Sequence, residues 1–472
     1  MDLLKDGFVD DELVRCDRCG FCMSTCPTYQ VMRDERAVAR GRNELVRQVA
    51  GGRMDILEQL RDPLFDCLLC GACTEVCFGS VKTDELMVRA RQAWHAEHGQ
   101  PRVQRIIFDE LLPHPARMTR LMRLLSMGKR HGLSGLAERL GMLGWLGPTV
   151  ARADGLVETM PRRFLRDHLP AMGFVIEREG RHVARRLPAR QDVRNSAPSV
   201  VFFIGCGTNY QVPAQGEAAI RLLAAAGCEV TILENCCCGL PPYSYGDREA
   251  AKRLAIRNLE LLDGLSFDYL VTECGSCSSF LRKWPRLLAG ESQAELAQRI
   301  ADRVRDFTQI MVGLRLPEPV PSPSYTVTYH DPCHLARGLG VTEEPRKLLT
   351  DVGGFQVREM AEADWCCGGA GSYNLTHADL SAQILQRKTA RIDETGADVV
   401  VTACPACVIQ LDYGMRHAHG HKPVRHVAEV LCDTRQVQLL SENTGRITCA
   451  DGECSRERAG SRRAHERADE VF

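Results

Sequence analysis

The feature that most constrains this chain is a pair of cysteine motifs with the same spacing near its N-terminus. CDRCGFCMSTCP and CLLCGACTEVCF both read C-x2-C-x2-C-x3-C, with cysteines at Cys16, Cys19, Cys22 and Cys26, and at Cys67, Cys70, Cys73 and Cys77. Three thiolates so spaced wrap one iron–sulfur cube, while the fourth ligates the other cube in two-cluster proteins. The spacing predicts two 4Fe–4S clusters, one on Cys16, Cys19, Cys22 and Cys77, the other on Cys67, Cys70, Cys73 and Cys26.

Zinc is the alternative occupant of these motifs, because four-thiolate zinc sites also use C-x2-C. Zinc knuckles take two such pairs set apart rather than four thiols within eleven residues, so the spacing favours iron–sulfur clusters. Phe78 stands where a proline is usual after the fourth cysteine, and we expect it to change only the exit of the chain. The 40 residues between Cys26 and Cys67 predict helices, including NELVRQV and MDILEQL, packed around the clusters.

An internal repeat follows in the second half of the chain. Short apolar runs at 199–206, 229–233 and 268–274 alternate with helical patterns, and the same order recurs from residue 325. The cysteines repeat with it at offsets of 127, 129 and 130 residues. They are Cys206, Cys237, Cys238, Cys274 and Cys277 in the first copy, and Cys333, Cys366, Cys367, Cys404 and Cys407 in the second. Each copy is predicted to be a small parallel α/β domain.

In each copy the cysteines follow the carboxyl ends of predicted strands, where parallel sheets place their ligands. All five thiols of a copy are therefore expected to converge on one crevice. Five thiols exceed the needs of zinc or an ordinary cube, which favours an unusual iron–sulfur cluster or a redox-active thiol site in at least one copy. A zinc site or a degenerate structural site remains the alternative. His330, Asp331 and His334 fit either tuning of the second site or plain hydrogen bonding at a strand end.

Other cysteines carry weaker signals. In ENCCCGLP the glycine after the pair aligns Gly239 with Gly368, so Cys236 falls opposite Trp365 and is a spare thiol. Cys228 and Cys432 lie in apolar surroundings typical of core residues. Cys449 and Cys454 lie in a polar tail, where exposure favours oxidation without implying a function.

Composition excludes several classes of function. The N-terminal segment is acidic and has no apolar core of a secretion signal, so we expect a cytoplasmic protein whose thiols bind metal rather than form disulfides. The net charge of −1 argues against nucleic acid as a partner. No dinucleotide or P-loop fingerprint occurs, so a hydride-handling cofactor such as flavin is expected on another subunit.

These patterns divide the chain into five regions. We expect a helical two-cluster ferredoxin-type domain at 1–95, a basic helical linker at 96–195, cysteine-rich domains at 196–318 and 319–435, and a disordered polar tail at 436–472. The fold class is thus α followed by α/β. The linker segment 117–146 mixes Arg and Lys with Leu, Met and Trp145, and fits either a helical layer on a neighbour or a peripheral contact with an anionic membrane.

These motifs, together with ARGR at 39–42 and PRRFLR at 161–166, resemble the iron–sulfur subunit of glycolate oxidase. Similar families are D-lactate dehydrogenase iron–sulfur subunits, the cluster subunit of anaerobic glycerol-3-phosphate dehydrogenase, and the cysteine-rich subunits of heterodisulfide reductase. The resemblance covers roughly residues 10–432. It implies a complex, often associated with a membrane, in which a flavin subunit oxidises a 2-hydroxy acid and electrons pass through this chain toward a quinone.

Both copies keep all five cysteines, as in the heterodisulfide reductase type, where such motifs hold non-cubane clusters. The resemblance therefore implies two 4Fe–4S clusters and one or two further clusters in the cysteine-rich domains. The expected function is electron transfer for a flavin-linked 2-hydroxy-acid dehydrogenase of the glycolate or D-lactate class. The alternatives are a catalytic disulfide or quinone reductase subunit and a zinc-stapled assembly protein.

Overall fold

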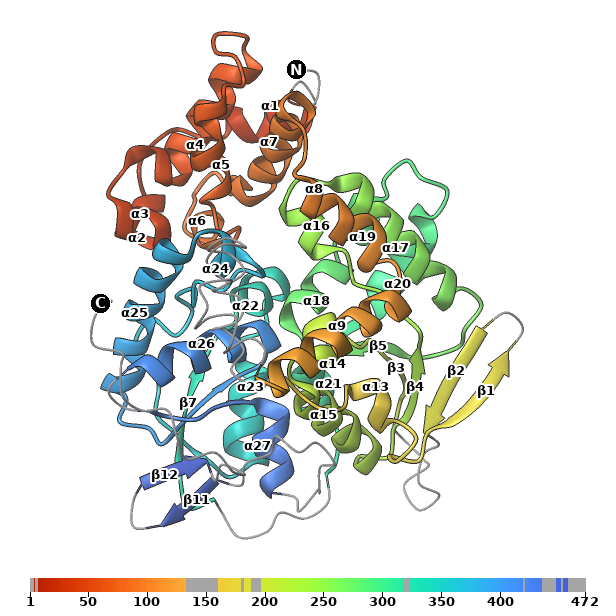
Figure 1. Cartoon of the computed structure of the whole chain (residues 1–472). Coiled ribbons are helices and arrows are strands. Elements are labelled where there is room, and N and C mark those ends of the chain that lie inside the picture. The colour runs from red at the N-terminus through yellow and green to blue at the C-terminus, as the bar shows by residue number, and fades with distance from the viewer. Residues whose placement is uncertain are drawn as a thin grey trace.

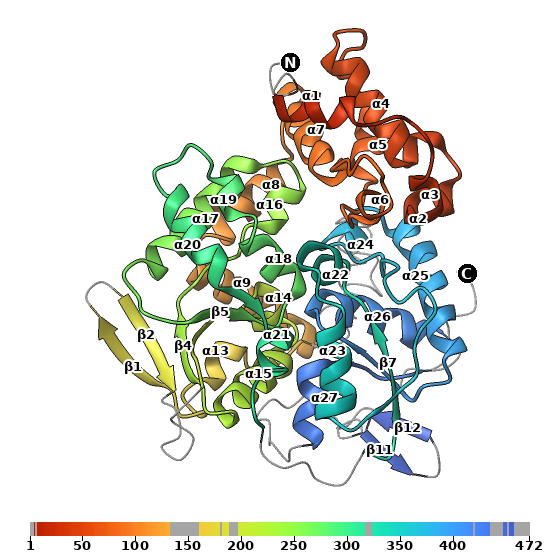
Figure 2. The ribbon, with the colours of Figure 1, turned by 180° about the vertical axis from the view of Figure 1, so that it is seen from behind.

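An N-terminal helical domain, a linker and two α/β domains follow one another along the chain in the computed structural model (Figure 1). The structure describes residues 4, 7–132, 160–179, 182–187, 197–316, 323–418, 421–434, 447–450 and 453–456. The N-terminal domain rests on the second α/β domain, with α6 directly above α22 and α24 in both views (Figures 1 and 2). The predicted fold class is confirmed.

Short helices surround the two N-terminal motifs. They are α1 (Gly7–Val14), α2 (Cys22–Thr25), α3 (Pro27–Met32), α4 (Ala39–Ala50), α5 (Arg61–Phe65), α6 (Ala72–Glu75) and α7 (Thr83–His98). Apolar positions of α4 and α7 pack with Leu60, Leu64 and Phe65 in a small core. NELVRQV is helical as predicted, but MDILEQL is not, since only Glu58–Leu60 forms a single 3-10 turn there.

The described part of the linker begins with helices and ends with two strands. It begins with α8 (Arg102–Arg105), a π-helical turn (Ile106–Leu111) and α9 (Pro115–Arg130), and resumes at α13 (Leu165–His168). The prediction of a helical segment through residue 195 is wrong at its end, where β1 (Val175–Glu179) and β2 (His182–Leu187) form an antiparallel hairpin. β2 extends the sheet of the first α/β domain by pairing with β4. Of the predicted membrane-contact segment 117–146, residues 133–146 lie outside the described residues.

The first α/β domain, called domain 1, holds a six-stranded sheet in the order β1-β2-β4-β3-β5-β6. Its own strands are β3 (Ser199–Phe202), β4 (Glu229–Leu233), β5 (Tyr269–Thr272) and β6 (Val304–Asp306), all parallel. Its helices are α14 (Cys206–Tyr210), α15 (Pro213–Ala225), α16 (Leu240–Ser244), α17 (Arg248–Leu262), α18 (Gly275–Leu281), α19 (Trp284–Leu287), α20 (Ala294–Arg303) and α21 (Phe307–Met311).

The second α/β domain, domain 2, repeats this topology with the order β10-β9-β7-β8. Its parallel strands are β7 (Thr326–His330), β8 (Gln356–Val357), β9 (Val399–Thr402) and β10 (Val424–His426). Its helices are α22 (Cys333–Leu339), α23 (Glu343–Lys347) continued by a π-helical turn (Leu348–Val352), α24 (Tyr373–Thr376), α25 (Ala378–Glu394), α26 (Pro405–His417) and α27 (Val427–Thr434). The three predicted strands of each copy are present. Each copy also has a short fourth parallel strand, β6 in domain 1 and β10 in domain 2.

The two domains share their interior. α15 of domain 1 packs on α27 of domain 2, and α18 packs on α22. One apolar cluster runs from Phe202 and Ile220 in domain 1 to Val401 and Leu431 in domain 2. The repeat therefore folds as one body whose two sheets place their carboxyl ends close together.

Two observations concern the remaining segments. In the region predicted as a disordered tail, β11 (Ile447–Ala450) and β12 (Glu453–Arg456) form a hairpin, so the prediction does not hold there; the rest of 436–472 lies outside the described residues. Among the described residues, no helix combines the length and the apolar character that crossing a bilayer requires.

Candidate functional site

Four thiols of the N-terminal domain line one cavity. Cys26 directly precedes α3, Cys67 and Cys70 come from the loop that leads into α6, and Cys73 lies in α6 itself. The loop turns back on itself at Gly71, whose φ of +76° is a left-handed conformation that glycine adopts without strain. The first motif thus contributes its fourth cysteine to the second motif's site, which is the exchange that the spacing predicts.

The other four N-terminal thiols, which we call the outer site, are exposed at Cys19 and half-buried at Cys16, Cys22 and Cys77. Cys22 lies close enough to Cys16 for the two thiols to interact electrostatically, and Asn43 Nδ2 donates to Cys16 Sγ at 3.5 Å. Phe21 and Phe78, each next to a cysteine, meet edge to face with ring centroids 5.0 Å apart. This contact joins the segment of Cys22 to that of Cys77, and Cys19 is exposed beside them.

Two buried arginines stand beside the inner cavity. Arg42 is 1% exposed and donates to Pro63 O and Thr28 Oγ1. Arg91 is 5% exposed and donates to Leu64 O and Cys67 O. Burying cations is unfavourable unless negative charge compensates them. Two buried guanidinium groups next to four thiols therefore fit a site built for thiolates and the anionic group that they hold.

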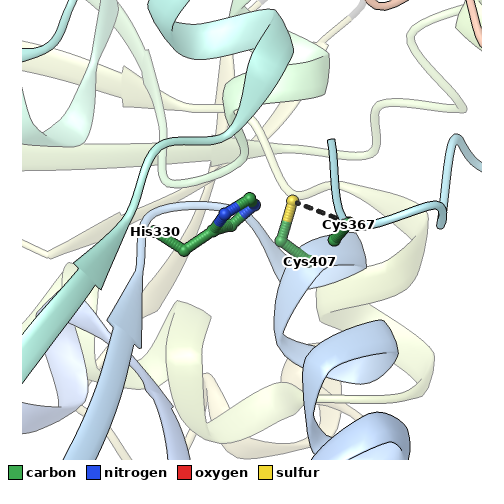
Figure 3. Close-up of side chains that lie close together, drawn as sticks. All are labelled: His330, Cys367 and Cys407. Carbon is green, nitrogen blue, oxygen red and sulfur yellow. Dashed lines mark hydrogen bonds between the residues drawn. The ribbon is translucent and has the colours of Figure 1, made fainter. Parts of the chain in front are cut away.

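In domain 2 the five predicted thiols form a continuous line. The thiol of Cys333 interacts with that of Cys366, Cys366 with Cys367, and Cys407 with Cys404. Cys367 Sγ lies 3.8 Å from Cys407 Sγ (Figure 3). The line arises because the parallel strands β7, β8 and β9 all end at the same edge of the sheet. The thiols lie in the segments that follow these strands.

His330, the last residue of β7, faces this line (Figure 3). One of its ring nitrogens and the Sγ atoms of Cys367 and Cys407 lie within 4.8 Å of one another. The side chain is 0% exposed, and neither nitrogen has a hydrogen-bond partner among the described residues. Burial lowers the pKa of His330 to about 3, so the ring is neutral. An orphaned buried imidazole aimed at thiols fits a group that would complete its bonding.

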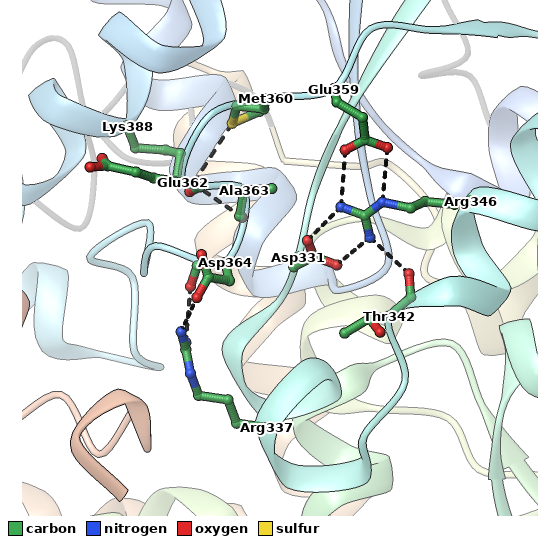
Figure 4. A network of polar contacts seen from close by, with 10 residues as sticks. All are labelled: Asp331, Arg337, Thr342, Arg346, Glu359, Met360, Glu362, Ala363, Asp364 and Lys388. Atoms are coloured by element: carbon green, nitrogen blue, oxygen red, sulfur yellow. Dashed lines mark hydrogen bonds and ion pairs between the residues drawn. The ribbon is translucent and has the colours of Figure 1, made fainter. Parts of the chain in front are cut away.

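A polar network fixes the loops that carry these residues (Figure 4). Arg346 forms paired hydrogen bonds with Asp331 at 2.9 and 2.8 Å and also binds Glu359, which anchors the segment between His330 and Cys333. Lys388 on α25 donates from Nζ to the carbonyls of Glu362 and Ala363, just before Cys366. Lys388 is 0% exposed, and among the described residues no carboxylate lies within ion-pair distance of its Nζ.

Domain 1 arranges its thiols in the same order. Cys206 contacts Cys237, Cys237 contacts Cys238, Cys238 contacts Cys277, and Cys277 contacts Cys274. Asn258 on α17 fixes the cysteine loop by donating to Cys237 O at 2.9 Å and accepting from Cys236 N at 3.0 Å. Cys236 Sγ points to Leu254 O and Asn258 Oδ1 rather than to another thiol, as expected for a spare thiol.

The separate groups of thiols meet end to end. Cys274 of domain 1 contacts Cys404 of domain 2, and Ser276 Oγ bridges Cys404 Sγ at 3.6 Å and His334 Nδ1 at 3.0 Å. At the other end of domain 2, Cys70 of the N-terminal cavity lies close enough to Cys366 and Cys333 to interact with both electrostatically. The structure therefore places the inner N-terminal thiols, domain 2 and domain 1 in series.

The chemistry of these residues fits iron–sulfur clusters. All 21 cysteines whose side chains are described are free of disulfides. Hydrogen bonds from neighbouring thiols lower the pKa of Cys238 to about 5, and lower the pKa values of Cys366 and Cys404 well below the ordinary range. Each domain thus favours at least one thiolate, the form that binds metal. Soft thiolate donors select iron–sulfur clusters or zinc, and both sites offer more sulfur than zinc requires.

Sequence reasoning missed two residues of this site. Nothing in the sequence marked Lys388, because it lies in a helical pattern where a lysine is ordinarily solvated. Asn258 was missed because it too lies in a helical pattern, although it precedes Lys388 by 130 residues, the offset of the C-x2-C motifs. Cys228 and Cys432 are 0% and 1% exposed in an apolar core, as predicted. The side chains of Cys449 and Cys454 lie outside the described part of the chain.

Comparison with family models assigns the same regions. Residues 12–81 match the 4Fe-4S dicluster domain, and residues 99–164 match the linker region of the glycolate oxidase iron-sulfur subunit. Residues 200–282 and 327–412 each match the cysteine-rich domain called CCG. The matches cover both cysteine groups described above and the segment between them.

Curated relatives agree with these matches. A probable glycolate oxidase iron-sulfur subunit from Bacillus subtilis is 31% identical over 91% of this chain and 95% of its own length. Lactate utilization protein A from Bacillus licheniformis is 34% identical over 49% of this chain and 98% of its own length. A fumarate reductase (CoM/CoB) subunit from Methanothermobacter marburgensis is 31% identical over 50% of this chain and 47% of its own length. With its two cluster motifs, its linker and its paired cysteine-rich domains, this chain belongs to the family of glycolate oxidase iron–sulfur subunits, which are iron–sulfur subunits of oxidoreductases.

Proposed function

We propose that this chain carries electrons for a flavin-linked 2-hydroxy-acid dehydrogenase of the glycolate or D-lactate class. In this proposal a separate flavin subunit oxidises the hydroxy acid, and electrons leave through this chain to a quinone or another acceptor. The complex works in the cytoplasm, where thiols stay reduced, or on the cytoplasmic face of a membrane.

The observation that carries the proposal is the serial arrangement of the thiols. The inner N-terminal cavity adjoins domain 2 at Cys70 and Cys366, and domain 2 adjoins domain 1 at Cys404 and Cys274. A protein that only needed zinc for stability would have no reason to bring its sites into contact in this way. Sites in contact through buried thiols suit the passage of single electrons, the chemistry that iron–sulfur clusters supply.

We assign the residues as follows. Cys16, Cys19, Cys22 and Cys77 would hold the outer 4Fe–4S cluster, and Cys26, Cys67, Cys70 and Cys73 the inner one. Five thiols would hold one further cluster in each cysteine-rich domain: Cys206, Cys237, Cys238, Cys274 and Cys277 in domain 1, and Cys333, Cys366, Cys367, Cys404 and Cys407 in domain 2. The arginines and Lys388 beside these thiols neutralise negative charge, and the apolar core excludes water from them.

The outer site is the natural place for a partner to deliver electrons. Cys19 is exposed there, and Phe21 and Phe78 are 56% and 84% exposed. The partner is proposed to be the flavin subunit because the sequence has no fingerprint for a nucleotide or flavin of its own. The glycolate and lactate names of the relatives favour a 2-hydroxy acid as that partner's substrate.

Anaerobic purification of the chain from its native host tests this proposal. We expect a flavin protein to co-purify, about eight irons per chain from the two cubes alone, and more if the cysteine-rich domains are loaded. Adding glycolate or D-lactate to the complex should reduce the clusters, as seen by EPR. A preparation that contained zinc and showed no cluster signal after reduction would sink the proposal.

The second candidate is a reductase subunit whose cysteine-rich site itself reduces a disulfide or a quinone. Both domains keep all five cysteines, and the fumarate reductase relative also matches half of this chain, which favours this alternative. Cys237→Ala and Cys366→Ala separate the two candidates. If the variants lose disulfide reduction while the N-terminal clusters stay intact, catalysis takes place at these sites. If the wild-type chain itself has no such activity, only the electron-transfer function is left.

A further inference from the structure

Two of the 23 cysteines have no role in the sites described so far. Eighteen are assigned to the four proposed cluster sites, and Cys228, Cys236 and Cys432 are buried in the apolar cores. The remaining two are Cys449 and Cys454, in the sequence ITCADGECSR. The matches to the cysteine-rich domain end at residue 412, so this pair lies beyond the repeated domains. Its chemistry depends on how the hairpin of β11 and β12 places it.

The hairpin places the two cysteines directly opposite each other. β11 and β12 form a two-stranded antiparallel sheet of their own (Figure 1). In its register Ala450 pairs with Glu453, and Cys449 pairs with Cys454. The residues that connect the strands are Asp-Gly at 451–452, a strong sequence signal for a tight hairpin. Because paired residues of a sheet lie on the same face, the two cysteines share one face of the hairpin.

The kind of pair sets the distance between the two cysteines. In a hairpin closed by two residues, the pair next to the connection exchanges hydrogen bonds, and the two kinds of pair then alternate. Cys449 and Cys454 are the second pair, which is a pair without hydrogen bonds. The Cα atoms of such pairs lie about 4.5 Å apart, within the range of about 4.4–6.8 Å that disulfides span. The register therefore brings the two cysteines to disulfide distance.

A cation shares the face of the two cysteines. Residues two positions apart on a strand lie on one face, so Arg456 lies on the face of Cys454, and it is diagonal to Cys449 across the hairpin. Positive charge near a cysteine favours the thiolate, which is the nucleophile of disulfide exchange. The acidic Glu453 is one position from Cys454 and falls on the opposite face. The hairpin thus combines two opposed cysteines with a charge that favours their reactive form.

We propose that Cys449 and Cys454 form a dithiol site that a small disulfide of the glutathione class oxidises to a cross-strand disulfide. One cysteine thiolate attacks the small disulfide and breaks its S–S bond, so that a mixed disulfide forms and one small thiol leaves. The other cysteine then attacks the mixed disulfide, forms the bond between Cys449 and Cys454, and releases the second small thiol. The two cysteines lose two electrons and two protons, and the small disulfide gains both to become two thiols.

The site is independent of the electron-transfer function proposed above. It needs no iron, and it uses none of the cysteines assigned to the clusters. Disulfides are transient in a reducing compartment, so this pair would form its bond when oxidised glutathione accumulates and open again when glutathione is reduced. A two-stranded hairpin is marginally stable in water, and the bond would hold this one closed.

The test follows one tryptic peptide of the full, cluster-loaded chain. Arg446 and Arg456 bound a peptide that contains both cysteines and no other. The chain is equilibrated anaerobically with oxidised glutathione at a fixed concentration of reduced glutathione, and free thiols are blocked with N-ethylmaleimide before digestion. Mass spectrometry should show the doubly labelled peptide converting to an unlabelled form, lighter than the dithiol by the mass of two hydrogens. Iron content before and after the treatment shows whether the clusters survive it.

A register-shifted variant is the matched control. Thr448→Cys combined with Cys449→Ser moves one thiol by a single position to the other face of the hairpin, while both thiols stay in the same peptide. This variant should need at least tenfold more oxidised glutathione for half conversion than the wild type. Equal conversion would mean that closeness in sequence is enough, and it would overturn the cross-strand site.

Three results for the wild type would also overturn the site. They are a peptide that stays doubly labelled at every ratio, glutathione attached to both cysteines without a bond between them, and a disulfide from either cysteine to another part of the chain. Each of these results would leave the electron-transfer function untouched. Conversely, a chain that held no iron would remove that function, and the same peptide would still test the dithiol site.

Discussion

Domains 1 and 2 share one topology and one order of thiols, yet they surround those thiols differently. Lys388 in domain 2 stands where domain 1 has Asn258, and His330 stands where domain 1 has Phe203. Domain 1 has buried acids near its thiols instead, and burial raises the pKa values of Glu273 and Asp306 to about 7. Duplication has therefore preserved the cysteine framework while the charges around it diverged, so the two sites are expected to differ in reduction potential rather than in ligation.

The largest effect is expected when one thiol is removed from either domain. Cys238→Ala in domain 1 and Cys367→Ala in domain 2 should each abolish the centre of the mutated domain, because each thiol contacts two others in its line. Iron analysis and EPR should then show loss of one centre with the N-terminal signals unchanged. Loss of both centres from a single substitution would mean that the domains hold one shared group, not two.

Exchanging the residues at the Lys388 position should shift potentials without loss of iron. Lys388→Asn removes a buried cation, and two unit charges about 8 Å apart interact by about 2 kcal/mol at an effective dielectric constant of about 20, or about 90 mV for one electron. The potential of the domain 2 centre should fall by that order, while Asn258→Lys should raise that of domain 1.

Redox titration followed by EPR measures both shifts. Lys347→Met is the matched control, since its side chain lies in the same domain but is 55% exposed and paired with Glu343. A shift as large in Lys347→Met as in Lys388→Asn would show that the effect is not local to the buried ammonium.

His330→Phe makes domain 2 resemble domain 1 and should have opposite effects in the two states of the protein. Without iron, both ring nitrogens are buried and unsatisfied among the described residues, so the phenylalanine should raise the free energy of unfolding by about 1–3 kcal/mol. When the centre is present, the imidazole can bond to it. His330→Phe should then alter the EPR signature and should no longer raise the free energy of unfolding. Denaturant unfolding of both forms checks the sign, and equal effects in both would contradict a bond from His330 to the centre.

The smallest effect is expected at the spare thiol. Cys236→Ala should keep the domain 1 centre, because the hydrogen-bond partners of Cys236 Sγ among the described residues are Cys237 O, Leu254 O and Asn258 Oδ1, and none is a thiol. Cys237→Ala is its neighbour and comparison, and should lose that centre. Iron content that falls equally in both variants would contradict the alignment of Cys236 with Trp365.

Local sequence patterns were enough to predict most of the strands and helices of this fold. The strands at 229–233 and 399–402 and the helix from Ala378 follow directly from β-branched runs and helical periodicity. The repeated cysteines fixed the alignment of the two domains, because thiols after strand ends meet at one edge of a parallel sheet. The spacing alone predicted that Cys26 groups with Cys67, Cys70 and Cys73, and these four thiols line one cavity.

What could not be predicted depends on distant parts of the chain. The three-residue strands β6 and β10 are too short to show a period, and the hairpin at 175–187 becomes a strand pair only because β4 offers an edge. The contact of Cys274 with Cys404, and the burial of Lys388 against Glu362 O, arise from how two domains and two loops pack.

The docking of the N-terminal domain on domain 2 also bears on the order in which the protein matures. Tyr373 of domain 2 donates to Asp66 O of the N-terminal domain at 3.1 Å, and Cys366 packs in the same apolar cluster with only 2% of its surface exposed. We expect a bulky maleimide to label Cys366 of the iron-free chain far more slowly than exposed Cys19, and equal rates would contradict this. For the cluster proposed in domain 2, metal would then have to enter before the N-terminal domain docks, so a maturation factor would act on the newly made chain before this contact closes.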